Sequence, residues 1–88
     1  MRFEWDEDKN LANIEKHGVS FEDAVRAFLD PKRKIRLNTM HSAFEMRYYC
    51  LGIVGERVLT VRFVIRGSRV RIIGAGYWRE GRKIYEQD

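Results

Sequence analysis

The stretch RVLTVRFVIRGSRVRIIGAG, residues 57–76, decides the fold of this chain. Apolar side chains alternate with threonine or arginine along both halves of it, which is the period of β-strands that have one apolar and one polar face. Gly67-Ser68 lies between the halves and has the composition of a two-residue hairpin turn. The stretch therefore predicts two antiparallel strands, at about 57–66 and 69–76.

The chain before this hairpin continues the alternation. Residues 44–53 are rich in aromatic and β-branched side chains, and the tight link Val54-Gly55-Glu56 connects them to the strand that follows. A further strand is predicted at about 33–38. We expect at least three of these strands to be antiparallel neighbours in one sheet.

The first part of the chain predicts a short strand and then a helix. Phe3 and Trp5 alternate with polar residues, as in a strand. Asp6 can then accept hydrogen bonds from the first free amides of a helix, and Gly18 can supply a left-handed stop after His17.

Two further helices are indicated. Ser20 with Asp23 forms a variant capping box, and Asp30-Pro31 ends the second helix. A last helix, from about Trp78 to Glu86, is weaker because Gly81 costs it about 1 kcal/mol relative to alanine. On the second helix the apolar residues fall on one face, namely Phe21, Ala24, Val25, Phe28 and Leu29.

These elements predict an α+β fold in the order β-α-α-β-β-β-β-α, with an antiparallel sheet, the two N-terminal helices on one face and a short C-terminal helix. The other face is expected to stay open or to await a partner. With 88 residues and 44% hydrophobic side chains, residues 1–88 have room for one domain.

Cysteine and hydropathy patterns bear on the compartment. The single Cys50 excludes a disulfide framework and favours a reducing environment, so we expect a cytoplasmic protein. The acidic start MRFEWDEDKN does not resemble a signal peptide, and no apolar run is long enough to predict membrane association.

The charge is unevenly distributed. Residues 1–31 hold four basic and eight acidic side chains, a net of −4, and residues 32–88 hold thirteen basic and five acidic ones, a net of +8, which together give the net charge of +4. Such asymmetry is typical of a chain that meets a polyanion or an acidic protein partner.

Strand alternation predicts a basic face on the sheet. Guanidinium groups bind phosphate oxygens in bidentate fashion, so the face favours a nucleic-acid partner, although a merely solvated face is the simpler alternative. Nearby aromatic residues could stack on unpaired bases or could belong to the core. The arginines are Arg47, Arg62, Arg66, Arg69 and Arg71, and the aromatic residues are Tyr49, Tyr77 and Trp78.

A second concentration of functional groups is the segment His41-Ser42-Ala43-Phe44-Glu45-Met46-Arg47. In an extended chain, its even spacing places His41, Glu45 and Arg47 on the same face. A proton-exchanging imidazole, a carboxylate and a cation would then share one patch. The alternative is that His41 caps a strand end and Glu45 pairs with an arginine. The sequence contains no zinc pattern, phosphate-binding glycine loop or nucleophile elbow.

The chain resembles the BrnT family, the toxin half of bacterial type II toxin–antitoxin pairs. The motifs that carry the resemblance are Phe3-Glu4-Trp5-Asp6, Asn13-Ile14-Glu15-Lys16-His17-Gly18-Val19-Ser20-Phe21, Asp30-Pro31, His41-Ser42, Glu45 with Arg47, Gly52, Arg66-Gly67, Arg71-Ile72-Ile73 and Tyr85-Glu86.

This resemblance implies a RelE-like fold, ribonuclease activity that arrests translation, and neutralisation by a BrnA-like antitoxin. The antitoxin of that family usually carries a DNA-binding domain, so the complex would meet promoter DNA through the antitoxin, with a heterotetramer as one possible assembly. The chain departs from the family at Gly74-Ala75-Gly76, where the family commonly reads Ser-Ala-Arg.

The expected reaction needs neither a metal nor a cofactor: the ribose 2′-hydroxyl attacks the adjacent phosphorus and the 5′-oxygen leaves. Its base would be Glu45 or His41, since either can take up a proton. The other residues fall into groups by expected role. Arg66 and Arg71 stabilise the transition state, and Arg47 positions the scissile phosphate. Arg62, Arg69 and Tyr77 bind RNA, and Arg79 or Arg82 binds flanking backbone.

Two other functions are weighed against this one. A noncatalytic module would bind RNA or an acidic antitoxin through the same basic face without chemistry. A DNA-binding repressor is disfavoured because neither helix before Pro31 is basic and no recognition helix is evident.

Overall fold

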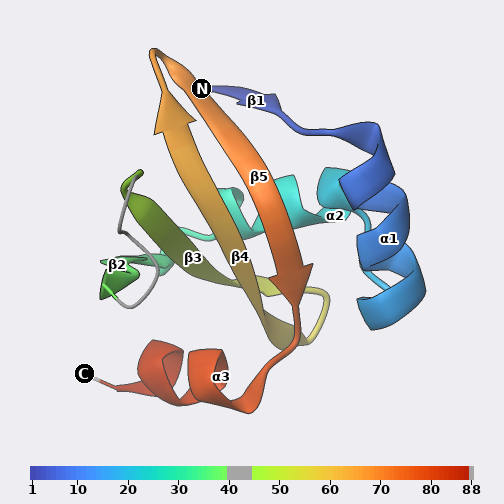
Figure 1. Cartoon of the computed structure of the whole chain (residues 1–88). Coiled ribbons are helices and arrows are strands. Elements are labelled where there is room, and N and C mark those ends of the chain that lie inside the picture. The colour runs from blue at the N-terminus through green and yellow to red at the C-terminus, as the bar shows by residue number, and fades with distance from the viewer. Residues whose placement is uncertain (40–44, 88) are drawn as a thin grey trace.

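The computed structural model describes residues 1–39 and 45–87. Along the described chain the elements are β1 (Arg2–Glu4), α1 (Glu7–His17), α2 (Phe21–Val25), the 3₁₀-helix η1 (Arg26–Leu29), β2 (Lys34–Leu37), β3 (Arg47–Val54), β4 (Arg57–Arg66), β5 (Arg69–Gly76) and α3 (Arg79–Glu86). The predicted α+β class and order of elements are confirmed (Figure 1).

The strands of the described residues form one five-stranded sheet in the order β1-β5-β4-β3-β2. The pairs β2–β3, β3–β4 and β4–β5 are antiparallel, as predicted. β1 lies parallel to β5, with Phe3 opposite Val70, so the sheet is mixed rather than wholly antiparallel. A tight hairpin joins only antiparallel neighbours, whereas β1 and β5 are separated by most of the chain, so no turn forces them to be antiparallel.

The predicted boundaries of α1 are confirmed by its two ends. The Asp6 carboxylate accepts hydrogen bonds from the backbone N–H groups of Asp8 (2.8 Å) and Lys9 (3.2 Å). Gly18 adopts a φ of +70°, in the left-handed region, and its N–H donates to the carbonyl of Ile14. These two caps fix the last residue of the helix, His17, at a defined place.

The second helix begins as predicted, with the Ser20 hydroxyl accepting from the N–H of Asp23, and then tightens into η1. The prediction that Leu29 belongs to the apolar face is wrong, because its residue is 74% exposed. A 3₁₀ turn has three residues instead of 3.6, so Ala27 takes the inward position and Leu29 rotates outward. Ala27 then lies so close to the sheet that a Cβ on Gly52 would be 2.2 Å from its carbonyl oxygen.

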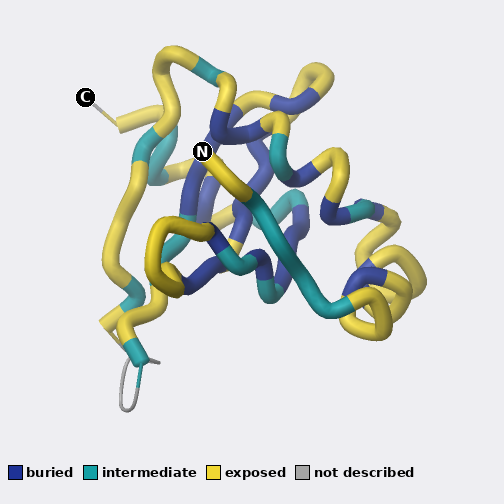
Figure 2. The backbone as a smooth tube through the Cα atoms, turned by 90° about the horizontal axis from the view of Figure 1, so that it is seen from above, coloured by how far each residue is buried: buried dark blue, intermediate teal, exposed yellow. Residues whose placement is uncertain are grey.

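The main core lies between the sheet and the segment formed by α2 and η1. Figure 2 shows the buried residues concentrated along the central strands and the helical segments packed on them. The side chains packed together there are Val19, Phe21, Ala24, Ala27, Phe28, Cys50, Val54, Leu59, Val61, Phe63, Val70, Ile72 and Ala75.

Two asparagines of α1 are buried, whereas Leu11 and Ile14 of the same helix are exposed. The Asn13 carboxamide donates to the carbonyls of Val19 and Ala75, both at 2.9 Å, and accepts from the N–H of Ala75 at 3.1 Å. Asn13 thus pairs with β5 as a neighbouring strand would, beyond the point where β1 ends. Polar contacts therefore attach α1 to the sheet.

We expect Asn13→Ala to destabilise the protein by about 2 to 4 kcal/mol, because it leaves buried backbone groups of Ala75 and Val19 without hydrogen-bond partners. Urea denaturation of wild type and variant measures this, with Glu15→Ala on the exposed side of α1 as the control. An Asn13→Ala protein as stable as the control variant would contradict the assignment.

α3 covers part of the opposite face of the sheet, so that face is not open along its whole length. The approach is close, since a Cβ on Gly81 would be 1.9 Å from the Thr60 hydroxyl oxygen and 3.0 Å from Leu51. The Thr60 hydroxyl is buried beneath the helix, without a hydrogen-bond partner among the described residues. Gly81 therefore allows α3 to pack closely on the sheet, although glycine stabilises a helix less than alanine does.

Polar contacts hold the carboxyl end of α3. Lys34 donates from its ammonium group to the carbonyls of Ile84, at 2.9 Å, and Gln87. The Tyr85 hydroxyl donates to the Asp30 carboxylate at 2.5 Å, and the same carboxylate oxygen accepts from the N–H of Ile53 at 2.8 Å. This bond raises the pKa of Tyr85 to about 12.

The variant Gly81→Ala should lower stability, although helix propensity alone would favour alanine by about 1 kcal/mol. The added methyl group has no space above Thr60. Thr60→Ala removes a buried, unpaired hydroxyl and should be close to neutral, and in that background Gly81→Ala should be better tolerated. Denaturation of the four proteins as a double-mutant cycle measures the coupling. A stabilising Gly81→Ala in the wild-type background would contradict this packing.

Ionisation of Tyr85 offers a pH test of the α3 contact. The hydrogen bond to Asp30 raises the pKa of Tyr85 from 10.0 to about 12 in the folded protein. Its stabilisation is therefore complete below pH 10 and is lost as the pH rises through about 12. Phenolate absorbance titrations of wild type and Tyr85→Phe should differ by one tyrosine with a midpoint near 12. A difference midpoint near the ordinary tyrosine value would show that the bond is absent in solution.

Candidate functional site

The sheet face that carries α3 also carries the arginines predicted to share a side. Across the strands, Arg47 lies opposite Val64, and Val64 lies opposite Arg71. Two residues after Val64 on β4, Arg66 lies opposite Arg69 of β5. Two residues before Val64, Arg62 lies opposite Tyr49 of β3 and Gly74 of β5. Directly opposed residues project from the same face. Their positions therefore agree with the predicted basic face, while their roles stay predictions.

Three of these arginines are paired with carboxylates near the end of the β4–β5 hairpin. Glu4 of β1 binds Arg69 (3.2 Å) and Arg71 (3.0 Å). Glu45 binds Arg66 through two contacts, of 3.1 and 3.4 Å. The hydrogen bond from Arg66 lowers the pKa of Glu45, and the same bond raises the pKa of Arg66. A Glu45 paired in this way accepts protons less readily than a free carboxylate.

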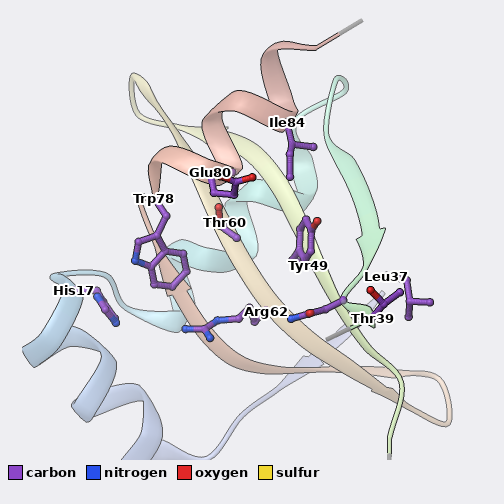
Figure 3. A pocket seen from close by; sticks show the side chains of 11 residues that line it. His17, Leu37, Thr39, Tyr49, Thr60, Arg62, Trp78, Glu80 and Ile84 are labelled. Atoms are coloured by element: carbon purple, nitrogen blue, oxygen red, sulfur yellow. The ribbon is translucent and has the colours of Figure 1, made fainter. Parts of the chain in front are cut away.

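A groove of about 690 Å³ opens on the same face beside α3 (Figure 3). Its lining residues come from the end of α1, from β2, β3 and β4, and from the start of α3. Its lining residues include His17, Tyr49, Thr60, Arg62, Trp78 and Glu80.

A second hollow, of about 290 Å³, adjoins this groove. The two share Asn38 and Arg62, and the second adds Lys9 and Arg47. Arg62 therefore stands at the junction of the two hollows. Within the described part of the chain, no carboxylate lies at ion-pair distance from Arg62.

Trp78 positions the side chains around the groove. The Arg62 guanidinium carbon lies 4.8 Å from the centre of the indole, and the His17 ring meets the indole edge-on, with centroids 5.1 Å apart. Gly76 lies so close that a Cβ there would be 2.6 Å from the indole, and a Cβ on Gly74 would be 3.3 Å from the Arg62 guanidinium. The two glycines thus make room for Arg62 and Trp78.

The remaining predicted RNA-binding residues lie at a third hollow, of about 520 Å³, on the other side of α3. Tyr77 donates its hydroxyl hydrogen to the carbonyl of Val54 at 3.2 Å, and Arg57 lies over its ring at 4.0 Å. Arg79 and Arg82 line the same hollow, and Arg82 approaches Glu86 at 4.0 Å. Tyr77, Arg79 and Arg82 therefore line this third hollow and not the groove around Arg62, although Trp78 borders both.

The predicted catalytic residues are only partly brought together. His41 lies outside the described residues, so its position stays a prediction. Glu45, Arg66 and Arg71 gather at the hairpin end, and they do not line the two hollows that meet at Arg62.

Sequence reasoning missed His17 and Glu80 as groove residues. A histidine in the last turn of a helix is already explained by its favourable interaction with the helix dipole. Glu80 lies in the predicted C-terminal helix, so the alternation of the strands does not relate it to the basic face. The signal that could have found His17 was the Lys16-His17-Gly18 stop itself, because a fixed helix end also fixes the direction of its last side chain.

The described residues provide neither a metal site nor a reactive thiol. They contain no group of three or more His, Cys, Asp or Glu side chains that could hold a metal ion. Burial of Cys50 raises its pKa to about 12, so its thiol stays protonated and does not act as a nucleophile at neutral pH.

Comparison with protein families identifies the family to which the chain belongs. Residues 5–81 match the family described as "Ribonuclease toxin, BrnT, of type II toxin-antitoxin system". The match covers most of the chain, so the protein belongs to the BrnT family of ribonuclease toxins. No curated protein sequence matches it. No helix among residues 1–39 and 45–87 has the length and apolar character needed to cross a membrane.

Proposed function

We propose that this chain is a metal-independent endoribonuclease that arrests translation in the cytoplasm and is neutralised by a small BrnA-like antitoxin. The observation that carries the proposal is the pair of adjoining hollows that share Arg62. Membership in a family of ribonuclease toxins supports it. In this proposal the antitoxin contacts promoter DNA, and the toxin and antitoxin assemble as a heterotetramer.

RNA lies along the two hollows on the basic face. Arg62 and Arg47, with Lys9 beside them, provide the positive charge that a phosphate backbone requires. Tyr49 lines the groove and offers an aromatic surface for an unpaired base. Trp78 holds the Arg62 guanidinium over its ring instead of presenting that surface to a base. This arrangement suits single-stranded RNA, whose bases are free to stack.

Cleavage begins when the ribose 2′-hydroxyl gives its proton to a base, His41 or Glu45, and its oxygen forms a bond to the adjacent phosphorus. The bond from phosphorus to the 5′-oxygen then breaks, leaving a 2′,3′-cyclic phosphate. Arg66 and Arg71 balance the charge that develops on the phosphorane. Arg69, Tyr77 and either Arg79 or Arg82 bind flanking RNA.

A noncatalytic binding module is the second candidate, and one observation favours it. Glu4 and Glu45 already neutralise three of the arginines assigned to RNA. Moreover, Gly76 stands where the family pattern has an arginine. A chain of this kind would bind RNA or an acidic antitoxin without cutting either.

The proposal is tested with purified protein and RNA in the presence of EDTA. Wild type should produce fragments with 2′,3′-cyclic phosphate and 5′-hydroxyl ends. Arg62→Ala should weaken RNA binding and slow cleavage when RNA is below saturation, because Arg62 is one of the cations assigned to the phosphate backbone.

Arg26→Ala is the matched control, because Arg26 is an exposed arginine of η1 that lines neither hollow. It should leave the cleavage rate unchanged. RNA binding by wild type without cyclic-phosphate products would favour the binding module, and equal rates for Arg62→Ala and Arg26→Ala would remove Arg62 from the site.

A further inference from the structure

His17 enters the groove from the end of α1. The left-handed Gly18 stops the helix directly after it, and Asn13 fastens the same helix to Ala75 of β5. The chain then passes from β5 to Trp78, whose indole the His17 ring contacts at 5.1 Å. The imidazole and the Arg62 guanidinium therefore both lie against the Trp78 indole, although His17 is exposed to solvent.

The described groove lining includes four ionisable side chains, His17, Tyr49, Arg62 and Glu80. Near pH 7, phenols and guanidinium groups ordinarily keep their protons, whereas carboxylic acids have lost theirs. Imidazole is the side chain that both holds and releases a proton between about pH 5 and 8. Of these lining residues, His17 is the one that supplies an imidazole to the groove.

The position of His17 relative to Arg62 indicates which proton it transfers. Glu45 and Arg66 lie at one end of the basic face, and Arg66 is four residues from Arg62 along β4, or about 13 Å. Trp78 lies on the other side of Arg62, because its indole packs over Gly76, which pairs with Thr60. His17 contacts this indole, and Figure 3 shows His17, Trp78 and Arg62 together at one end of the groove. An in-line displacement places the attacking and leaving oxygens on opposite sides of phosphorus. With the base on the Arg66 side of Arg62, a general acid on the opposite side, where His17 lines the groove, completes such a displacement.

We propose that His17 is the general acid of the cleavage reaction, an inference that rests on the proposed function. As the bond between phosphorus and the 5′-oxygen breaks, that oxygen takes its electron pair and receives a proton from the imidazolium. The 2′-hydroxyl proton has gone to the base, so the products are a cyclic phosphate, a 5′-hydroxyl and a neutral imidazole. Trp78 is a positioning residue that orients the His17 ring.

The competing role for His17 is structural, through its ring contact with Trp78. His17→Phe separates the two roles, because phenylalanine keeps an aromatic ring against the indole and has no proton to donate. Lys16→Ala is the control, since Lys16 is the exposed neighbour at the same helix end. Thermal unfolding of each variant shows whether the fold is kept.

The experiment first maps a cleavage site of the wild-type protein in RNA. It then uses two matched oligonucleotides, one with the natural linkage and one in which sulfur replaces the bridging 5′-oxygen at that site. Sulfur leaves without being protonated, so the second oligonucleotide needs no general acid. RNA binding is measured for every variant.

We expect His17→Phe to cut the natural RNA about 100- to 10,000-fold more slowly than wild type, the contribution that general acid catalysis makes. The variant should bind RNA normally and should cut the sulfur-containing oligonucleotide at nearly the wild-type rate. Lys16→Ala should behave as wild type on both.

Two results would overturn the assignment while leaving the proposed function intact: wild-type cleavage of natural RNA by His17→Phe, or an equal defect of this variant on both oligonucleotides. A wild-type protein that releases no cyclic-phosphate products overturns the proposed function and this inference together.

Discussion

The arrangement of the site depends on the carboxamide of Asn13. Helix α1 keeps its apolar Leu11 and Ile14 toward solvent, so hydrophobic burial alone does not attach it to the sheet. Instead, Asn13 satisfies both backbone groups of Ala75, at the end of β5 that β1 does not cover. Because hydrogen bonds are directional, this attachment also sets the rotation of α1 and thus the direction in which its last residue points.

Close backbone approach is the second constraint on the face that carries the groove. α3 packs over Thr60 through Gly81, and the indole of Trp78 packs over Gly76. Larger residues at either position would push the C-terminal segment away from the sheet and widen the groove. The same absence of side chains leaves space at Gly74 for the Arg62 guanidinium, so small residues on β5 determine where this cation lies.

Local patterns in the sequence predict the elements well, because strand alternation, the caps at Asp6 and Gly18, and the Gly67 turn are short-range effects. They fail where distant residues decide. Leu29 is exposed because a 3₁₀ turn packs closely against Gly52. A glycine is needed at position 81 because Thr60 lies directly beneath it. Likewise, alternation predicts which arginines share a face. It does not predict their ion pairs with Glu4 and Glu45 or the contact of His17 with Trp78, because these depend on how α1 and the strands assemble.

The carboxylate of Glu4, shared between Arg69 and Arg71, has a consequence for the thermodynamics of polyanion association. The ionic-strength dependence of such binding reflects the number of counterions set free when phosphates are neutralised. An arginine that exchanges an internal carboxylate for a phosphate releases fewer ions than one that was solvated. The salt dependence of RNA affinity is therefore set by the number of arginines that are solvated before binding. A count of all arginines on the face would predict too steep a salt dependence.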